Sequence, residues 1–407
     1  MTQTPQSRQE CQALDATDPL AAARVRFALP DGVIYLDGHS LGPATHAALE
    51  RVARTASAEW REGLIRSWNT AGWIDLPARA GARIARLIGA KPDEVLVTDS
   101  VTVNLFKLAG AALKLATRPA LMFEEDDFPT DQYVVQGLAD LAGVPPVRLP
   151  RSGSLHAFAD TRGVLVKSVV DYRTAEVADI AVWEAAAKRH DSVIVWDLSH
   201  AAGVIDIDLN RLGVRLAAGC TYKFLNGGPG APAFVYVSAT PDTFSSPIWG
   251  WFAAENQFGF GAQFEQKTGA AGFAAGTPPV LSLATLDAAL EAFDGVRLAD
   301  VQTKARALGD LVIARTAAMA LETISPTDPS RRGGHVSVRH AQGYAVVQAL
   351  IARGIIPDFR APDAMRFGLA PLYVRFTDVW DAMDALADIL ATRAWDKPEF
   401  HARAKVT

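Results

Sequence analysis

The sequence predicts an α/β protein with a mainly parallel sheet covered by helices, followed by a smaller α+β domain. Between residues 95 and 196, short apolar runs bounded by polar turns alternate with longer segments of helical spacing. This alternation is typical of parallel βαβ units with helices on both faces of the sheet. The 407 residues are 49% hydrophobic and 21% charged, which provides for a sizeable core and argues against disorder.

The first elements are weakly marked. Residues 1–25 are polar and Ala-rich, and we expect a mobile lead-in with some helix. Residues 33–36 predict a short strand, which stops at the turn signal Asp37-Gly38. Apolar residues at helical spacing then predict a helix from residue 47 to about residue 60.

The alternating region predicts the sheet and the helices that cover it. We expect strands at 95–97, 121–123, 164–166 and 193–196, separated by helices at 102–115, 131–142 and 177–189. Parallel strands need such crossover helices. The region therefore predicts one domain.

Near residue 290 the pattern changes. A long helix through Val301 and Val312 precedes a strand, a helix and further strands over 335–376, and a final helix passes through Val379 and Leu390. We therefore expect three parts: an N-terminal segment (1–45) that contributes to the small domain and the active site, a large domain (46–290), and a small C-terminal α+β domain (291–407).

Charge and cysteine content exclude several kinds of partner and compartment. The chain has 40 Lys and Arg against 45 Asp and Glu, a formal charge of −5, and the charges are interspersed, so we expect no nucleic-acid or anionic-lipid partner. Cys11 and Cys220 are too few for a disulfide framework, which favours a reducing compartment. Without a signal-peptide pattern or a long apolar run, we expect no membrane association and a cytoplasmic location.

Chemistry-bearing residues concentrate between residues 196 and 230. Asp197 closes a buried apolar strand, where side chains face the ligand crevice of an α/β sheet. Lys223 has small and aromatic neighbours and precedes a Gly-rich turn, and a desolvated lysine is a usable amine nucleophile. A lysine for a Schiff base and an aspartate for the ring nitrogen are the two groups that pyridoxal phosphate (PLP) requires. By spacing alone, two solvated surface charges remain the more common interpretation.

Residues elsewhere extend this pattern. Thr102 and its neighbours at a predicted helix start could seat a phosphate, although by themselves they are more often an ordinary N-cap. Phe128 follows a strand and could stack on a ring or simply plug the core. Ser168 offers a hydroxyl to the same crevice or is a polar strand position.

Together these residues resemble the fold-type I PLP enzymes and, among them, the kynureninases. The resemblance covers nearly the whole chain, and the order and spacing of its motifs are specific. One departure is His39, where the family usually has Asn, which leaves the local contact to substrate open. The motifs are Gly38-His39-Ser40-Leu41-Gly42, Val101-Thr102-Val103-Asn104-Leu105, Phe128-Pro129-Thr130-Asp131, Asp197-Leu198-Ser199-His200-Ala201, Tyr222-Lys223-Phe224-Leu225-Asn226, Gly250-Trp251, Gly276-Thr277-Pro278-Pro279, Arg366-Phe367-Gly368 and Pro371-Leu372-Tyr373.

The resemblance implies a fold-type I architecture with a seven-stranded-type sheet, and PLP as the cofactor. It implies that Lys223 forms the Schiff base and that Asp197 pairs with the ring nitrogen. In this family a Trp and a Thr come from the partner subunit, so Trp251 and Thr277 imply a homodimer with shared active sites. The further implied cofactor contacts are Val101, Thr102, Phe128, Asp131, Ser168, His200, Tyr222, Trp251 and Thr277.

The resemblance also assigns the substrate side. It places Arg366 where the family binds the substrate carboxylate, a contact that a guanidinium makes bidentately. Arg375 is expected to form a surface ion pair instead. Ser40 and Trp68 are further substrate-binding candidates, and Trp73 and Trp249 are other candidates for an aryl slot, although each Trp is more often a core residue. The candidate site includes no metal ligand.

The implied reaction is PLP-dependent hydrolysis of the Cβ–Cγ bond of L-kynurenine, or of 3-hydroxykynurenine. The products are anthranilate, or 3-hydroxyanthranilate, and L-alanine, in tryptophan catabolism and the kynurenine pathway that feeds NAD biosynthesis. Lys223, Asp197 and Tyr222 are the implied catalytic residues. Tyr222 would act as an acid, which a phenol with a pKa of about 10 suits only if its surroundings lower that pKa.

Two alternatives remain. A cysteine desulfurase, selenocysteine lyase or aminotransferase-like enzyme could have the same fold, but a desulfurase needs a thiolate on a mobile loop. Cys220 lies three residues before Lys223 in a buried segment, and Cys11 lies in the lead-in, so neither is well placed. A PLP-binding scaffold without catalysis is the other alternative, and the intact set of Lys223, Asp197 and Arg366 weighs against it.

Overall fold

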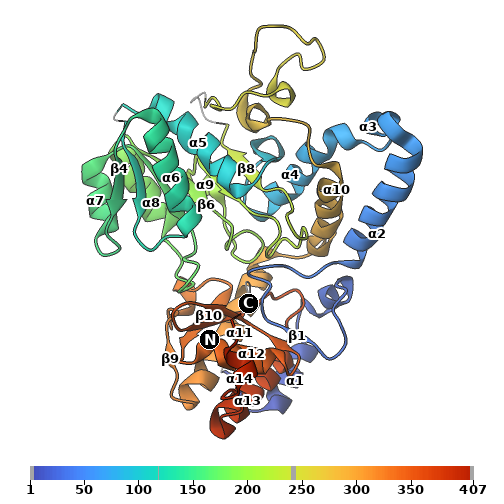
Figure 1. Cartoon of the computed structure of the whole chain (residues 1–407), viewed down its shortest axis with the longest axis vertical. Coiled ribbons are helices and arrows are strands. Elements are labelled where there is room, and N and C mark those ends of the chain that lie inside the picture. The colour runs from blue at the N-terminus through green and yellow to red at the C-terminus, as the bar shows by residue number, and fades with distance from the viewer. Residues whose placement is uncertain (1–3, 118, 240–243, 404–407) are drawn as a thin grey trace.

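A seven-stranded sheet organises the middle of the chain (Figure 1). The computed structural model describes residues 4–117, 119–239 and 244–403. Every neighbouring pair of strands is parallel except the two pairs that include β8, so the predicted α/β class with a mainly parallel sheet is confirmed. In sheet order the strands are β2 (Val95–Val97), β8 (Phe234–Val237), β7 (Leu216–Gly219), β6 (Val193–Asp197), β5 (Val164–Ser168), β3 (Leu121–Glu124) and β4 (Pro146–Leu149).

Helices cover both faces of this sheet (Figure 1). Along β6, Val193 and Val195 belong to one hydrophobic cluster, while Ile194 and Trp196 belong to the other. Successive side chains of a strand point to opposite faces, so both faces are packed, which explains the nearly continuous apolar strands. The helices are α4 (Leu76–Leu87), α5 (Val101–Leu115), α6 (Pro129–Ala142), α7 (Ser154–Thr161), α8 (Ile180–Arg189), α9 (Leu209–Leu212) and α10 (Val280–Ala289).

The part after residue 290 contains a four-stranded antiparallel sheet and its own helices. Its strands are, in sheet order, β12 (Asp358–Arg360), β13 (Ala364–Gly368), β10 (His335–Arg339) and β9 (Glu322–Thr323). A separate strand, β11 (Ile355–Ile356), pairs in parallel with β1 (Ile34–Tyr35), which brings the segment after residue 35 to this part. The helices are α11 (Leu298–Ala318), α12 (Gly343–Ile351), α13 (Phe376–Thr392) and α14 (Pro398–His401).

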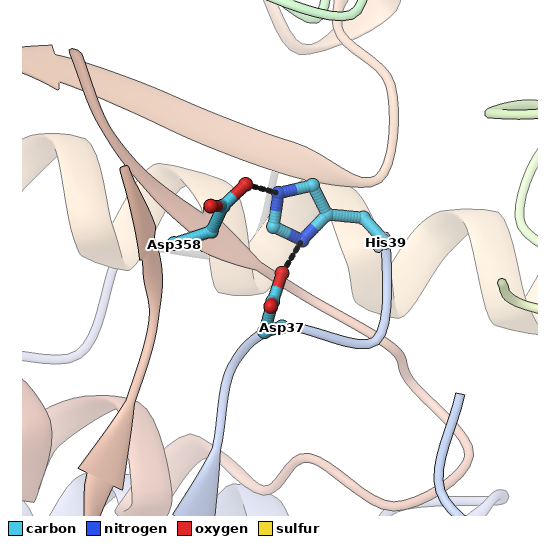
Figure 2. A group of neighbouring side chains, drawn as sticks. All are labelled: Asp37, His39 and Asp358. Atoms are coloured by element: carbon cyan, nitrogen blue, oxygen red, sulfur yellow. Dashed lines mark ion pairs between the residues drawn. The ribbon is translucent and has the colours of Figure 1, made fainter. Parts of the chain in front are cut away.

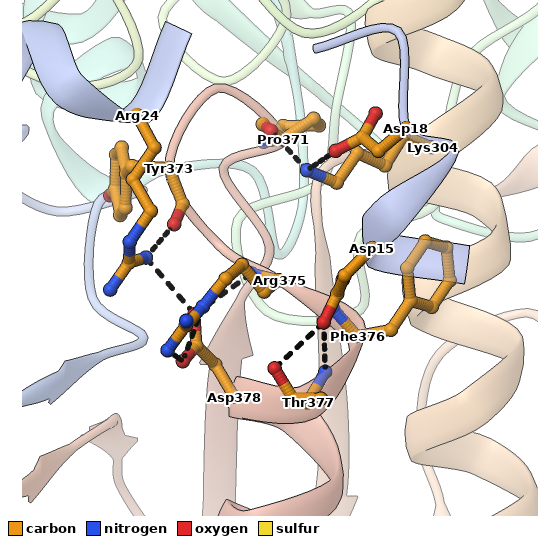
Figure 3. Close-up of polar contacts among 10 residues, drawn as sticks. All are labelled: Asp15, Asp18, Arg24, Lys304, Pro371, Tyr373, Arg375, Phe376, Thr377 and Asp378. Carbon is orange, nitrogen blue, oxygen red and sulfur yellow. Dashed lines mark hydrogen bonds and ion pairs between the residues drawn. The ribbon is translucent and has the colours of Figure 1, made fainter. Parts of the chain in front are cut away.

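The N-terminal segment docks on this C-terminal part (Figure 3). It forms α1 (Arg8–Ala16) and a short 3₁₀ helix, η1 (Ala21–Arg26). The carboxylate of Asp15 accepts hydrogen bonds from the backbone N–H groups of Phe376 (2.7 Å) and Thr377 (3.1 Å) at the start of α13. The ammonium of Lys304 donates to Asp18 at 2.6 Å. The predicted mobile lead-in is therefore wrong for this segment, because side chains far along the sequence hold it.

The segments between these elements are short helices and turns. The predicted helix at 47–60 is present as α2 (His46–Arg54), which continues as a wider helical segment, η2 (Thr55–Gly63). Among the described residues, no helix combines the length and the apolar character that crossing a bilayer requires. The other short elements are η3 (Leu64–Arg66), α3 (Ser67–Thr70), η4 (Trp73–Asp75), η5 (Pro92–Glu94), η6 (Trp251–Ala253), η7 (Gly269–Phe273), η8 (Leu290–Phe293) and η9 (Pro329–Arg331).

Candidate active site

A cavity of about 210 Å³ lies where β5 and β6 end. The carboxyl ends of parallel strands meet at one edge of a sheet, so residues from separate strands converge there. Asp197 and Ser168 are the last residues of these two strands. The structure brings nine of the predicted residues to this cavity: Val101, Thr102, Phe128, Asp131, Ser168, Asp197, His200, Tyr222 and Lys223.

Lys223 lies in the loop between β7 and β8. Its carbonyl accepts a hydrogen bond from the N–H of Asn226 at 2.9 Å, and the N–H of Gly42 donates to the carbonyl of Tyr222 at 2.7 Å. A Cβ atom at Gly42 would lie 2.3 Å from the carbonyl oxygen of Lys223, so only glycine allows this approach. The N-terminal segment therefore supports the lysine loop directly.

Buried carboxylates surround the far side of the cavity. Asp197 accepts hydrogen bonds from the N–H (2.8 Å) and hydroxyl (2.5 Å) of Ser199. Burial raises the pKa of Asp197, and the nearby Lys223 ammonium opposes that shift. Burial and repulsion from Asp197 raise the pKa of Asp131 well above its usual range. Asp131 Oδ1 has no hydrogen-bond partner among the described residues. This edge of the cavity therefore suits a cationic or proton-donating group.

The opposite end of the cavity is the N-terminus of α5. The hydroxyl of Ser100 accepts a hydrogen bond from the N–H of Val103 at 3.4 Å, so the N-cap interpretation is correct for Ser100. Val101 and Thr102 occupy the first turn and line the cavity. First-turn N–H groups and the helix dipole favour an anion such as phosphate.

Aromatic residues flank the lysine. The Lys223 ammonium lies 5.9 Å from the ring centroids of both Phe128 and Tyr222. Phe128 contacts Tyr172 edge-on, with ring centroids 5.3 Å apart, and its ring is 39% exposed. Phe128 therefore lies in a loop at the cavity and does not plug the core. An exposed aromatic face at the cavity is suited to stacking on a ring.

Two titratable groups at the cavity have pKa values set mainly by burial. Burial raises the pKa of the Tyr222 phenol, which is opposite to the direction that sequence analysis required of an acid, so the phenol stays protonated. Burial, and then the Lys223 ammonium, lower the pKa of His200 well below its usual range. His200 is therefore neutral, and its buried Nδ1 atom has no hydrogen-bond partner within the described ranges.

Arg366 and Ser40 meet just behind the cavity. Arg366 lies in β13 and is 1% exposed. Its Nε donates to Asp358 Oδ2 at 2.9 Å, its Nη1 donates to the carbonyl of Tyr172 at 2.5 Å, and its Nη2 donates to the hydroxyl of Ser40 at 3.3 Å. Tyr172 lines the cavity, so the guanidinium contacts a residue of the cavity wall. Arg375 instead pairs with Asp378 at 2.7 Å, the ion pair expected for it.

Two other cofactor-contact candidates, Trp251 and Thr277, lie away from this cavity within one chain. Trp251 is 37% exposed and is surrounded by the rings of Phe252, Phe258 and Phe260. Thr277 lines a separate cavity of about 340 Å³.

The tryptophan candidates for the aryl slot lie away from the cavity as well. Trp68 packs edge-on against Trp73 with centroids 5.9 Å apart, and Trp249 stacks on Phe264 at 4.9 Å. None of the three lines the lysine cavity.

Sequence analysis assigned no role to several residues that the structure places at the site. Ser199 binds Asp197 and lies two residues after it, so its position next to the strand end could have indicated it. The carboxylate of Asp127 accepts a hydrogen bond from the N–H of Ser168 at 3.0 Å, and its place in a strand-end loop is a comparable signal. Tyr172 and Asp358 have no such local signal, because tertiary packing alone brings them here.

The cysteines do not suit sulfur chemistry. Cys11 and Cys220 are buried. Burial raises the pKa of the Cys11 thiol to about 11 and also raises the pKa of the Cys220 thiol. Both are therefore thiols at neutral pH, whereas a sulfur acceptor needs an accessible thiolate.

Solved structures share the fold of this chain. A C-DES mutant with glycine covalently linked to the PLP cofactor has a TM-score of 0.77 and 19% identity, over 90% of this chain and 99% of that chain. The cysteine desulfurase CsdA from Escherichia coli has a TM-score of 0.76 and 18% identity, over 92% and 98% of the two chains. These similarities show the fold-type I architecture, and at this identity they show the fold alone.

Sequence relatives are much closer. The family model described as the kynureninase C-terminal domain matches residues 301–386. A kynureninase from Pseudomonas fluorescens is 43% identical over 419 aligned residues, which cover 98% of this chain and all of the relative. The aligned residues include both the lysine cavity and the Arg366 region. Similarity of this extent shows that the chain belongs to the kynureninase family.

Proposed function

We propose that this chain hydrolyses the Cβ–Cγ bond of L-kynurenine to anthranilate and L-alanine, and acts likewise on 3-hydroxykynurenine to give 3-hydroxyanthranilate. As a member of the kynureninase family, it is a PLP-dependent enzyme. The observation that carries the proposal is the cavity that holds Lys223, Asp197 and the first turn of α5 together. An amine, a buried carboxylate and an anion site are the three features that this cofactor needs.

The residues at the cavity fit the cofactor. The unpartnered Oδ1 of Asp131 and the carboxylate of Asp197 suit a protonated ring nitrogen, because a positive group there offsets two buried carboxylates. Val101 and Thr102 would hold the phosphate, and Phe128 would stack on the ring. Ser168, His200 and Tyr222 would complete the contacts. When bound, PLP supplies an aldehyde for an amine and a ring that withdraws electrons from the adjoining carbon.

Each catalytic residue then has a role at a stated atom. The Nζ of Lys223 removes the α-proton of the substrate, because the free amine is a base within reach of the cavity. The carboxylate of Asp197 holds a proton on the ring nitrogen. Burial raises the pKa of the Tyr222 phenol, so its Oη keeps its proton at neutral pH. The Oη would donate that proton to the departing carbon when negative charge develops on that carbon.

The substrate side rests on Arg366 and Ser40, which meet through a 3.3 Å contact. We propose that they orient the α-carboxylate. Trp68 remains a proposed aryl contact, although its ring packs against Trp73 in one chain. The desulfurase, selenocysteine lyase and aminotransferase-like alternatives share only the fold, and the buried cysteines give a desulfurase no sulfur acceptor.

The decisive test is the release of alanine and anthranilate from L-kynurenine by the purified protein, with 3-hydroxykynurenine assayed in parallel. We expect both products in equal amounts and a visible absorption band that borohydride removes. A protein that shows the band but forms no product would be the PLP-binding scaffold without catalysis. Absence of both the band and the products would reject the proposed function itself.

We also propose a homodimer with shared active sites, in which Trp251 and Thr277 reach the partner's cofactor. Their separation from the lysine cavity within one chain supports this. Large apolar side chains that are exposed in one chain also support it, since an apolar surface of this kind is typical of an interface. These residues are Trp60, Leu64, Ile65, Trp249, Phe258, Phe260 and Leu281.

Subunit mixing tests the shared site. Lys223→Ala subunits are mixed with subunits altered at both Trp251 and Thr277, each inactive alone. About half of randomly paired dimers would carry one good site, so activity should approach about a quarter of the wild-type value. If mass spectrometry detects heterodimers while activity stays absent, these residues act within their own chain.

The remaining proposals concern organisation and cellular context. We propose that the parts 1–45, 46–290 and 291–407 are the N-terminal segment, the large domain and the small domain. The docking of α1 on α13 supports the link between the first and the last of these. We propose a cytoplasmic enzyme of tryptophan catabolism, in the kynurenine pathway that leads toward NAD.

A further inference from the structure

The loop after β1 and strand β12 bring a histidine, His39, between two carboxylates, Asp37 and Asp358 (Figure 2). His39 Nδ1 lies 3.5 Å from Asp37 Oδ1, and His39 Nε2 lies 3.7 Å from Asp358 Oδ2. The same Asp358 oxygen accepts the hydrogen bond from Arg366 Nε. We call Asp37, His39, Asp358 and Arg366 the carboxylate-side cluster. It adjoins the substrate-binding pair proposed above, because Ser40 contacts both Arg366 and Asp358.

The imidazole of His39 is fixed in orientation. His39 is fully buried and stacks on His335, with centroids 4.9 Å apart and an interplanar angle of 17°. A Cβ atom at Gly368 would lie 2.2 Å from His39 Nδ1, so glycine leaves the room that the ring occupies. The ring therefore stays in the line between Asp37 and Asp358.

Proton count distinguishes two states of this arrangement. A neutral imidazole has one N–H and can donate to only one of the two carboxylates, whereas an imidazolium donates to both. Neither ring nitrogen of His39 has a hydrogen-bond partner at normal distance among the described residues. His39 can therefore donate to both carboxylates of the cluster only if its imidazole takes up a second proton.

Distance alone would also allow these three side chains to bind a metal ion. Positive charge already occupies that place, because Asp358 binds Arg366 through Oδ2 and Arg360 through Oδ1 (3.0 Å). Two guanidinium groups beside one carboxylate repel a further cation. We therefore treat the cluster as a proton site.

The surrounding charges set where the proton resides. Burial, and then the positive charge of Arg366, lower the pKa of His39 well below its usual range. Burial and repulsion from Asp358 raise the pKa of Asp37 to about 7. When no ligand is bound, the proton that the cluster exchanges with solvent therefore resides on Asp37. The charged and titratable groups that act on the cluster are Tyr35, His200, His335, Asp358, Arg360, Arg366 and Tyr373.

We propose that His39 is a positioning residue that takes up a proton when Arg366 binds the substrate carboxylate. This inference rests on the proposed function, since it takes the ligand of Arg366 to be a carboxylate. A carboxylate at Arg366 cancels the charge that keeps His39 neutral and adds a negative charge nearby. One proton then enters from solvent, and the resulting imidazolium donates to Asp37 and Asp358. Asp358 thus keeps a cationic partner while Arg366 turns toward the substrate.

The test counts protons on binding of a carboxylate that cannot react with the cofactor. The probe is 4-phenyl-4-oxobutanoate, which keeps the carbon skeleton and carboxylate of the substrate but lacks its α-amino group and its aryl amino group. Calorimetric titrations of the PLP-loaded enzyme in two buffers of different ionisation enthalpy give the number of protons taken up. At about pH 8, above the pKa of Asp37, we expect binding to take up nearly one proton. The affinity for the probe should then rise by up to about tenfold for each unit that the pH falls, until about pH 7.

Two variants and two controls make the test specific. His39→Asn, which restores the usual family residue, and Asp37→Asn should each reduce the uptake to near zero and flatten the pH dependence. His156→Asn changes an exposed histidine that pairs with Asp160 and should behave as wild type. The matching amide, 4-phenyl-4-oxobutanamide, should cause no uptake in any variant.

Defined outcomes would overturn the inference. It is wrong if His39→Asn takes up as many protons as wild type, if wild type takes up none, or if the carboxylate fails to bind. Zinc binding that Asp37→Asn abolishes would also overturn it in favour of a metal site. Kynurenine turnover by wild type, measured separately, shows whether only this inference fails or whether the proposed function fails as well.

Discussion

The lysine cavity and the carboxylate-side cluster lie side by side but are assembled differently. The cavity takes its residues from the ends of neighbouring strands of one sheet, and from helix and loop starts that follow such strands. The cluster joins a loop after β1 to two strands of the C-terminal sheet, more than three hundred residues later in the chain. One site follows from sheet topology, and the other depends on how the N-terminal segment docks.

The two regions also differ in how their charges are satisfied. Asp131 in the cavity retains a buried oxygen without a hydrogen-bond partner in the described part of the chain, which indicates that a ligand completes it. In the cluster, both ring nitrogens of His39 and Oδ1 of Asp37 also lack a hydrogen-bond partner among the described residues, but the charges of Asp358 and Arg366 already neutralise each other. Substitutions in the cavity should therefore change activity more than stability, whereas substitutions in the cluster should change both.

The largest expected effect is in the cavity. Lys223→Ala removes the amine that we propose binds the cofactor and moves the α-proton, so we expect turnover of kynurenine to fall by about 10⁴-fold or more. The protein should still hold PLP without a covalent link, because the phosphate and ring contacts remain. Alanine release and absorption spectra before and after borohydride measure the two effects. Full activity in this variant would remove the central assignment.

Asp197→Ala should have the next largest effect. It removes the carboxylate that we propose keeps the ring nitrogen protonated, and we expect turnover to fall about 10³-fold. The unfolding midpoint should change little, because the wild-type carboxylate is itself buried at a cost. A fall of less than about tenfold, roughly 1.4 kcal/mol of barrier, would show that another group protonates the ring.

The contrast between the regions also explains what could be predicted from the sequence. The strand at residues 193–197 and the helix after Ser100 have strong local patterns, so their ends, and the site residues on those ends, could be predicted. β7 is Leu-Ala-Ala-Gly and has no clear strand pattern. β8 is Phe-Val-Tyr-Val, which favours a strand, but its antiparallel place between β7 and β2 follows from pairing across the sheet rather than from local propensity.

Contacts between distant segments could not be predicted. The polar composition of residues 8–26 indicated mobility, but Asp15 and Asp18 find partners near residues 304 and 376. The positions of Tyr172 and Asp358 at the site likewise depend on how the C-terminal sheet packs against the cavity. The resemblance to a family supplied Arg366, and it did not indicate that Asp358 would occupy its guanidinium.

Arg366→Gln should affect binding and stability together. We expect the KM for kynurenine to rise, because a charge-assisted contact to the carboxylate is lost. The expected loss of binding free energy is about 2–4 kcal/mol. The buried Asp358 would lose the partner of its Oδ2 and keep Arg360 at its Oδ1, which costs up to about 3–5 kcal/mol of stability. Adding Asp358→Asn removes the buried charge that Arg366 no longer offsets, so the double variant should recover stability while KM stays high. Recovery of KM as well would show that Arg366 does not bind substrate. Steady-state kinetics and urea unfolding measure both effects.

The smallest expected effect is at α1, whose residues line neither the lysine cavity nor the cluster. Asp15→Ala removes the acceptor for three hydrogen bonds at the start of α13 (Figure 3), and loss of such a cap costs about 1–2 kcal/mol. Arg8→Ala removes an exposed ion pair on the same helix with Asp381 and should leave the urea midpoint unchanged. Neither should alter kcat, because Lys223 and Asp197 keep their surroundings. If both variants shift the midpoint equally, α1 is held by general contacts rather than by the cap. If Asp15→Ala raises the KM for kynurenine while leaving kcat unchanged, docking of α1 affects substrate binding at the cluster but not catalysis in the cavity. Such a result would show that the two regions respond separately.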